Sequence, residues 1–126
     1  MTPNSARALV MGHGEFAAGM ISAVEQIAGR GDAFVTLGNS GLSPGGIESR
    51  LREALAASGA RVIFTDLPAG SCTMAARRIA KAEGDITVVT GATLPTLLAF
   101  ALGADAREAA ERGREALLVV EGGGGT

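Results

Sequence analysis

Short apolar runs rich in β-branched residues alternate along the chain with stretches of helical period, and Gly or Pro stands at most of the junctions. This alternation predicts strands joined by helices, the pattern of a parallel sheet covered on both faces. The predicted strands are residues 6–11, 33–37, 61–66 and 85–90. We therefore expect an α/β fold with a four-stranded sheet.

Amphipathic stretches follow each predicted strand. The first helix begins after Gly14, and four large apolar residues are predicted to form its inward face: Phe16, Met20, Val24 and Ile27. A second helix links the second and third strands, and a third begins near Ser71 or Cys72. After the fourth strand, one helix is predicted from about residue 94 and another over residues 105–117.

Right-handed crossovers between these strands favour a doubly wound, mainly parallel sheet in the order 2-1-3-4, with helices on both faces. In this order the chain leaves strands 1 and 3 toward opposite faces, which opens a crevice at their carboxyl ends. Residues 1–121 are predicted to form one domain, because 47% of the chain is hydrophobic and its length suits a single core. The Gly-rich tail, residues 122–126, is predicted to be disordered.

Composition excludes several classes of function. The net charge of -2 and the presence of only four aromatic residues, all Phe, argue against a nucleic-acid partner. A single histidine and a single cysteine provide no metal site and no internal disulfide, and nothing in the sequence calls for a cofactor. No apolar run has the length of a membrane span, and the first residues do not resemble a signal peptide, so we expect a cytoplasmic protein.

The only histidine and a carboxylate follow the two strands that border the predicted crevice. His13 comes directly after strand 1, and Asp66 ends strand 3. Side chains just past the ends of adjacent strands can come within hydrogen-bond reach, because the strands are about 4.8 Å apart. If Asp66 accepts a hydrogen bond from one ring N–H, the other ring nitrogen keeps its lone pair and is a nucleophile at neutral pH. We therefore predict His13 and Asp66 as catalytic residues.

Groups suited to holding an anion surround the predicted nucleophile. Gly14 precedes the first turn of one helix, and Gly70 and Ser71 stand at the start of another. Free N–H groups at helix N-termini bind anions, so these three residues are predicted to bind a phosphoryl group without a metal. The glycines on both sides of His13 are predicted to leave room for a donor group on another protein.

Simpler interpretations of the same residues remain open. His13 can be a turn residue between glycines, and Asp66 can cap a backbone N–H at the strand end. Ser71 is equally compatible with an ordinary N-cap. Cys72 has either a lowered pKa at a helix N-terminus or, as we favour, a packing role in the core.

Three stretches of the chain resemble the IIA domain of the mannose family of bacterial sugar phosphotransferase systems: VMGHGEFAAGM, TDLPAGSCTMAARRI and VVTGATLPTLLAFAL. The similarity extends through about residue 115. It implies that His13 accepts a phosphoryl group from phospho-HPr and that Asp66 is its carboxylate partner. It further implies that the phosphoryl group passes to a IIB component, which phosphorylates sugar entering through membrane permease subunits. The chain would then be a phosphotransferase that works beside a permease complex.

The chain departs from the family pattern at a few positions. Where the family has a Gly-Gly-Ser-Pro-like turn, this chain has residues 69–72, AGSC, and the asparagines expected at two further positions are Met74 and Thr93. The family also implies a homodimer, often with an antiparallel edge strand contributed by the partner subunit. Residues 117–120, LLVV, are either such a swapped strand or the end of the last helix.

Three other functions are compatible with these observations. One is the similar phosphotransfer subunit that serves dihydroxyacetone kinase, which also uses a histidine after its first strand. Another is a regulatory module of the phosphotransferase system, in which a phosphorylated His13 controls binding to a partner outside transport. The third is a sheet domain without catalytic activity, in which the histidine is incidental.

Overall fold

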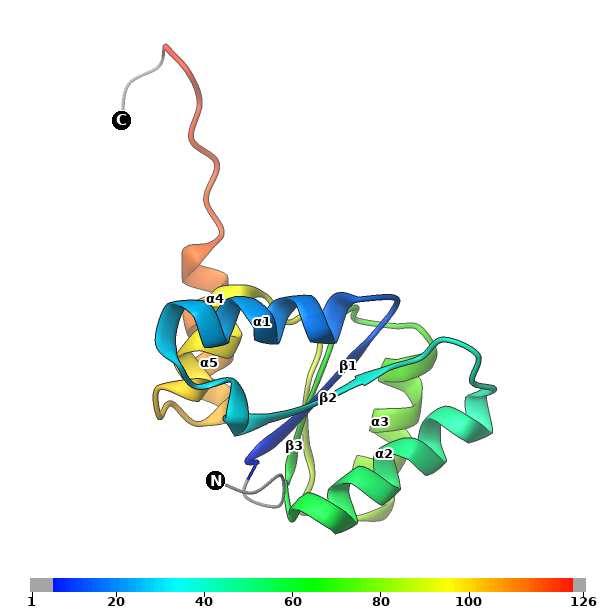
Figure 1. Cartoon of the computed structure of the whole chain (residues 1–126). Helices are drawn as coiled ribbons and strands as arrows, with labels where there is room; N and C mark the ends of the chain where they lie inside the picture. Colours follow the sequence, from blue (N-terminus) through cyan, green and yellow to red (C-terminus); the bar gives the residue numbers. More distant parts are fainter. Residues whose placement is uncertain (1–5, 124–126) are drawn as a thin grey trace.

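A four-stranded parallel sheet forms the centre of the computed structural model, which describes residues 6–123 (Figure 1). The strands are β1 (Ala8–Gly12), β2 (Phe34–Gly38), β3 (Val62–Thr65) and β4 (Thr87–Val89). Their order in the sheet is β2-β1-β3-β4, and every pair is parallel. The predicted α/β class and strand order are therefore confirmed.

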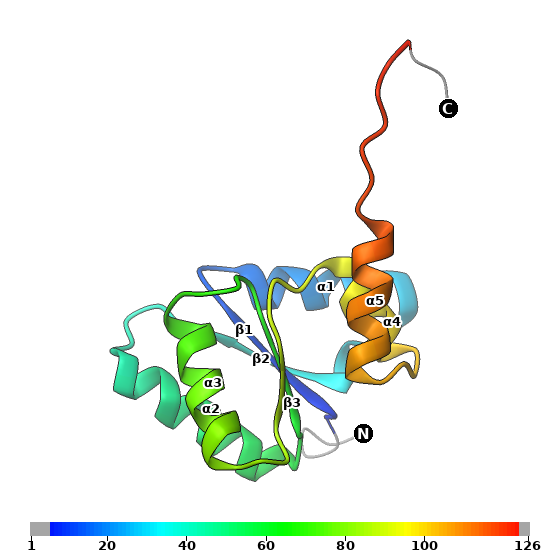
Figure 2. The same cartoon turned by 180° about the vertical axis from the view of Figure 1, so that it is seen from behind.

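Helices cover both faces of this sheet. They are α1 (Phe16–Ala28), the 3-10 turn η2 (Gly31–Ala33), α2 (Pro44–Ser58), α3 (Ser71–Ala82), α4 (Leu94–Ala101) and α5 (Ala106–Ala116). Figures 1 and 2 show α1, α4 and α5 on one face and α2 and α3 on the other. Among the helices of residues 6–123, none combines the length and apolar character needed to cross a membrane.

Strand β1 lies in the middle of the fold and is buried along its whole length. Ala8 and Val10 pack into the core beneath α1 and α4, whereas Leu9 and Met11 pack into the core beneath α2 and α3. This burial on both faces explains why the strand is apolar throughout rather than alternating, as is typical of a parallel sheet. The strand is thus held firmly up to the residue before His13.

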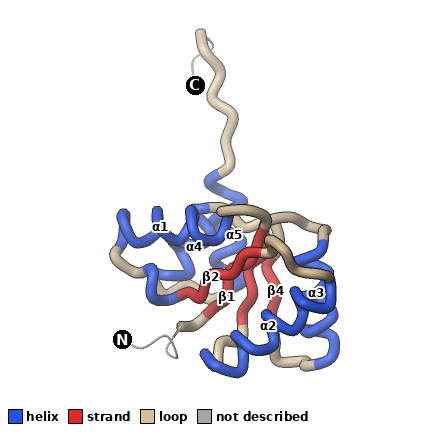
Figure 3. The backbone as a smooth tube through the Cα atoms, turned by 45° about the vertical axis from the view of Figure 1, so that its right-hand side comes forward, coloured by secondary structure: helices blue, strands red, loops and turns tan. Residues whose placement is uncertain are grey.

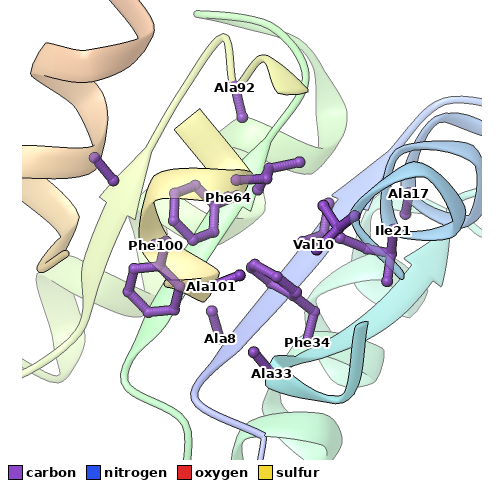
Figure 4. Close-up of a cluster of buried hydrophobic side chains, with 13 residues drawn as sticks. Ala8, Val10, Ala17, Ile21, Ala33, Phe34, Phe64, Ala92, Phe100 and Ala101 are labelled. Carbon is purple, nitrogen blue, oxygen red and sulfur yellow. The ribbon is translucent and has the colours of Figure 1, made fainter. Parts of the chain in front are cut away.

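Three of the four phenylalanines meet in the core beneath α1 and α4 (Figure 4). Phe64 of β3 and Phe100 of α4 pack edge to face, with ring centroids 5.1 Å apart, and Phe34 of β2 contacts both. The Arg7 guanidinium lies over the ring of Phe100, 4.5 Å from its centroid. These contacts tie β2, β3 and α4 together and stabilise the sheet by burying large aromatic surfaces.

The predicted inward face of α1 is confirmed at Val24 and in part at Phe16 and Met20, and it is wrong at Ile27. The buried residues of the helix are Ala17, Ile21 and Val24. Phe16 and Met20 lie at the margin of the core, and Ile27 is 62% exposed. Both sets of residues have helical spacing, so periodicity alone did not distinguish them. The small side chain of Ala17 lies in the core, and the larger side chains of Phe16 and Met20 cover the margin of the core.

Predicted element boundaries shift by one or two residues at most strands. Strand β4 is shorter than predicted because Ile86 N–H still donates to the carbonyl of Glu83 in the preceding turn. Helix α5 ends at Ala116, so residues 117–120 do not extend it. Residues 122–123 lie in a turn, and residues 124–126 of the predicted disordered tail fall outside the described residues. The single domain over residues 1–121 stays a prediction.

A glycine allows α5 to pack closely against α4. A Cβ built on Gly113 would lie 1.9 Å from Oγ1 of Thr96, far closer than any real contact. Gly113→Ala is therefore expected to lower the free energy of unfolding by about 1 to 3 kcal/mol, because the two helices must move apart. Urea unfolding followed by circular dichroism measures this change.

Gly19→Ala is the matched control, since Gly19 also lies within a helix but a Cβ there meets nothing within 4 Å. It is expected to leave the free energy of unfolding unchanged or to raise it by up to about 1 kcal/mol. Equal stability of the Gly113→Ala variant and the wild-type protein would show that α4 and α5 are not packed as described.

Candidate active site

The carboxyl ends of β1 and β3 bring the predicted catalytic residues together. Met11 of β1 pairs with Thr65 of β3 in the sheet register, so His13 and Asp66 leave the sheet side by side. The chain then continues into α1 on one face and α3 on the other (Figure 3). This is the divergence predicted between strands 1 and 3, and it places His13 where ligands bind in open α/β sheets.

One carboxylate oxygen holds both the backbone and the ring of the histidine. Asp66 Oδ2 accepts a hydrogen bond from the backbone N–H of His13 at 2.9 Å and lies 2.8 Å from its ring Nδ1. A carboxylate can only accept, so Nδ1 carries the proton of the neutral ring and Nε2 has the free lone pair. The side chain of His13 is 51% exposed, whereas that of Asp66 is 11% exposed. The ring is thus fixed on one side and accessible on the other.

Asp66 is held as an anion. Burial, the largest single effect, raises its pKa, but the hydrogen bonds from the backbone and ring of His13 outweigh burial and leave the pKa below its usual value. Its second oxygen, Oδ1, is buried and has no hydrogen-bond partner among the described residues. A buried, unpaired carboxylate oxygen is costly, and such groups are typical of functional sites.

Gly12 makes this arrangement sterically feasible. A Cβ on Gly12 would lie 2.6 Å from a ring carbon of Phe16 and 2.9 Å from the carboxylate carbon of Asp66. The predicted reason for this glycine, space for a donor group on another protein, is therefore wrong, because the missing side chain makes room for Asp66. Gly14 does fit that prediction: it is exposed, its φ is +52°, and a Cβ there meets nothing within 4 Å.

The loop before α3 passes beside the histidine ring. Gly70 has a φ of +117°, and a Cβ placed there would lie 3.7 Å from Cε1 of His13. Gly70 is also the N-cap of α3, so the alternative that Ser71 is the N-cap is wrong, and Ser71 is instead the first helical residue. The N–H groups in the first turn of α3 have no acceptor within the helix. Gly70 and Ser71 thus lie at a helix N-terminus close to His13.

Cys72 has the packing role that the sequence favoured. It is fully buried among the apolar side chains beneath α2 and α3. Burial, followed by the negative charge of Asp66, raises the pKa of its thiol, so the alternative of a reactive thiolate is wrong. Within residues 6–123, no group of three or more His, Cys, Asp or Glu side chains is arranged to hold a metal ion.

The other departures from the family pattern have clear places in the fold. Met74 is 44% exposed on α3. Thr93 is the N-cap of α4, and its hydroxyl accepts a hydrogen bond from the backbone N–H of Thr96. Thr93 thus stands where the family pattern has an asparagine, and threonine, like asparagine, favours the N-cap position.

Two threonines contact the site loop and were missed by the sequence analysis. Oγ1 of Thr73 lies 2.6 Å from the carbonyl oxygen of Leu67 and 2.7 Å from Oγ1 of Thr65. The available signal was their position, since Thr65 ends a strand and Thr73 lies in the first turn of the helix that follows. The hydrogen-bond partners of the two hydroxyls could not be predicted, because they depend on how the loop between the two threonines folds.

The overall structure resembles solved phosphotransferase-system proteins. The crystal structure of phosphotransferase system component EIIA from Streptococcus agalactiae has a TM-score of 0.81 and 20% identity, covering 90% of this chain and 96% of that one. The mannose/sorbose specific IIA subunit from Enterococcus faecalis has a TM-score of 0.79 and 18% identity, with coverages of 93% and 96%. The PTS IIA protein associated with the fucose utilization operon of Streptococcus pneumoniae has a TM-score of 0.80 and 22% identity, with coverages of 91% and 93%. These likenesses establish the shared fold.

The sequence itself identifies the family. No curated protein sequence matches the chain significantly. The model of a protein family described as PTS system fructose IIA component, the EIIA-man family, matches residues 7–117, which include the whole sheet and all five α-helices up to the end of α5. The resemblance inferred from the three motifs is confirmed: the chain belongs to the PTS system fructose IIA component family and is a phosphotransfer component of the phosphotransferase system.

Proposed function

We propose that the chain accepts a phosphoryl group from phospho-HPr on His13 and passes it to a IIB component. The observation that carries this proposal is the 2.8 Å contact between Nδ1 of His13 and Oδ2 of Asp66, on a ring that is half exposed. This contact leaves Nε2 as the nucleophilic nitrogen. Membership of the IIA family supports the direction of transfer.

The chemistry needs no proton to leave the histidine ring. The Nε2 lone pair attacks phosphorus while the N–P bond of the donor phosphohistidine breaks, and its electron pair returns to the donor nitrogen. Nδ1–H stays bonded to Asp66, whose negative charge stabilises the positive charge that develops on the ring. Transfer to IIB is the same exchange with His13 as the donor. Catalysis then consists mainly of positioning and charge stabilisation.

Gly14, Gly70 and Ser71 are proposed to bind the transferred group. Gly70 lies beside Cε1 of His13, and the first turn of α3 begins at Ser71, so its free N–H groups and the Ser71 hydroxyl are available to phosphoryl oxygens. Gly14 directly follows His13 and is exposed, and a Cβ there would meet nothing within 4 Å, so its backbone is accessible to the phosphoryl group. Because these donors are fixed before the phosphoryl group arrives, they stabilise it without reorganisation.

The exposed surface around His13 is proposed to be the docking surface for HPr and IIB. Leu67, close to Gly70, and Met74, on α3, expose apolar side chains, and Pro68 lies exposed between Leu67 and Gly70. A protein donor must approach closely, since the reacting atoms come within about 3 to 3.5 Å. We place this exchange in the cytoplasm beside the permease subunits, and the choice of sugar belongs to those partners.

Stepwise reconstitution tests the proposal. Incubation with phosphoenolpyruvate, enzyme I and HPr is expected to add one acid-labile phosphoryl group, and purified IIB is expected to remove it. Loss of the label to the nucleotide bound by dihydroxyacetone kinase, but not to IIB, would instead support the kinase-subunit alternative. A stable label that neither acceptor removes would support a regulatory module. Failure of HPr to label the folded chain would contradict the proposal as a whole.

A homodimer is proposed from the C-terminal segment and the open edge of the sheet. Residues 117–120 follow α5 and extend away from the domain (Figure 3). Their four apolar side chains are 72% to 86% exposed. β4 is an outer strand, and a cleft of about 550 Å³ runs between it and α5. An exposed apolar segment and an unpaired strand edge are both unfavourable in a monomer. Pairing the segment with the β4 edge of a second copy satisfies both.

Light scattering is expected to give a dimer mass at tens of micromolar protein, and deletion of residues 117–126 is expected to give a monomer. Deletion of residues 121–126 alone is the control and should leave the dimer, because it retains the apolar segment. A monomeric wild-type protein would exclude the dimer. A dimer that persists without residues 117–126 would exclude strand exchange but not dimerisation through another surface.

A further inference from the structure

We propose that the hydroxyl groups of Thr65 and Thr73 form a positioning pair, which holds the loop carrying Asp66 so that its carboxylate keeps both contacts with His13. The expected effect on the transfer rate rests on the proposed function of His13, whereas the expected effect on the tautomer of its ring does not. It assigns a role to two residues that touch neither the phosphoryl group nor the histidine.

The chemistry of the groups fixes the direction of the hydrogen bonds. A carbonyl oxygen can only accept, so the Thr73 hydroxyl must donate its one hydrogen to the carbonyl of Leu67, 2.6 Å away. The same hydroxyl is also placed to donate to Oγ1 of Thr65, 2.7 Å away, so its hydrogen is shared between two acceptors. The Thr73 hydroxyl, in the first turn of α3, thus connects the Thr65 side chain at the end of β3 with the peptide between Leu67 and Pro68.

These hydrogen bonds span a loop with little other regular structure. Residues 66–70 belong to neither β3 nor α3. The ends of the loop are held by backbone bonds, from Ala92 N–H to the Thr65 carbonyl and from Met74 N–H to the Gly70 carbonyl. The Leu67 carbonyl lies between those ends, in the peptide between Leu67 and Pro68, so its bond to Thr73 holds the loop one residue beyond Asp66.

Burial gives these bonds their importance. Thr65 is fully buried and Thr73 is 1% exposed, so water cannot replace a lost partner at either hydroxyl. The room around Asp66 is also limited, since a single added carbon at Gly12 would clash with its carboxylate. A small shift of the loop therefore removes Oδ2 from the position in which it bonds both the backbone and the ring of His13.

Thr73→Val is the decisive variant, because valine keeps the shape of threonine and removes its hydroxyl. Thr73→Ser restores the hydroxyl and is the rescue. Thr96→Val is the matched control, since Thr96 is also 3% exposed and its hydroxyl bonds Thr93, in the N-terminal turn of α4. The readouts are the transfer rate from phospho-HPr and the ¹⁵N spectrum of the imidazole at a pH where the ring is neutral. The chain has one histidine, so the ring signals need no assignment.

The wild-type ring is expected to be a single Nδ1–H tautomer. Thr73→Val is expected to give a mixture of tautomers and a rate roughly tenfold lower, whereas Thr73→Ser should match the wild-type tautomer and rate. Thr96→Val is expected to change neither readout, even if it lowers the melting temperature. A folded Thr73→Val variant with the wild-type tautomer and rate would overturn the inference, as would an equal effect of Thr96→Val.

Thr65→Val provides a second test if Thr73→Val does not fold. It leaves the bond from Thr73 to Leu67 possible but removes the group that orients the Thr73 hydroxyl, so a smaller change of the same kind is expected. A wild-type spectrum for this variant would overturn the role of the pair. If HPr does not label the wild-type protein, the proposed function fails while the ¹⁵N spectra still decide the positioning role.

Discussion

His13→Ala is expected to abolish phosphoryl uptake from phospho-HPr while the domain folds normally. The variant removes the only imidazole of the chain and with it the nucleophilic Nε2. The side chain is half exposed at the end of the sheet, and the backbone N–H of residue 13 can still donate to Asp66. The free energy of unfolding should therefore change by no more than about 1 kcal/mol. Intact mass measurement and urea unfolding of the same preparation report both quantities.

Ser71→Ala is the companion variant for this experiment, because Ser71 is the one residue predicted at the site whose side chain carries a hydroxyl. It is expected to be labelled to completion, at a rate that depends on how much its hydroxyl contributes to phosphoryl binding. Label that persists in His13→Ala and disappears in Ser71→Ala would mean that the acceptor is the serine. Loss of label from His13→Ala together with unfolding would call for His13→Gln, which retains more of the side chain.

Asp66→Asn is expected to slow phosphoryl transfer by about one to two decades and to leave the fold intact. The amide oxygen can take the place of Oδ2 and accept from the backbone and the ring of His13, so the geometry is retained. The amide has no negative charge to stabilise the cationic ring. Loss of a charge-assisted hydrogen bond corresponds to roughly 1.5 to 3 kcal/mol when its full effect is expressed in the transition state. Rapid-quench measurement of single-turnover transfer from phospho-HPr gives the rate.

The control for this change is Asp85→Asn, which also converts a carboxylate to an amide. Asp85 lies just before β4, at the opposite end of the sheet, and pairs with Arg61 on an exposed surface. An exposed ion pair contributes little, so neither rate nor stability should change measurably. Wild-type transfer by Asp66→Asn would reduce Asp66 to a structural role, and equal slowing by both variants would point to a general effect of net charge.

The sheet order and the meeting of His13 with Asp66 could be predicted because both follow from local patterns. Each strand is a short apolar run and each helix has a clear period, and the right-handed crossover rule then leaves few arrangements. Once strands 1 and 3 are neighbours, residues at their carboxyl ends must lie close together. The register of Met11 with Thr65 shows how directly this follows.

The features that the sequence did not predict depend on contacts between distant segments. The buried face of α1 includes Ala17, whose small size matters only once the distance to the sheet is known. The need for glycine at position 12 arises from Phe16 and from Asp66, which is far away in the sequence. The bond from Thr73 to Leu67 likewise requires the conformation of the intervening loop. Periodicity and motif spacing contain none of this information.

Peptide mapping of the phosphorylated wild-type protein tests the central claim most directly. The protein is labelled with phosphoenolpyruvate, enzyme I and HPr, and is then digested and analysed under alkaline conditions, in which a phosphoramidate survives. We predict one phosphoryl group, located on His13 and lost on brief acid treatment. An acid-stable phosphate on the peptide that contains Ser71, or no phosphate on a folded chain, would contradict the assignment of His13 as the phosphoryl acceptor.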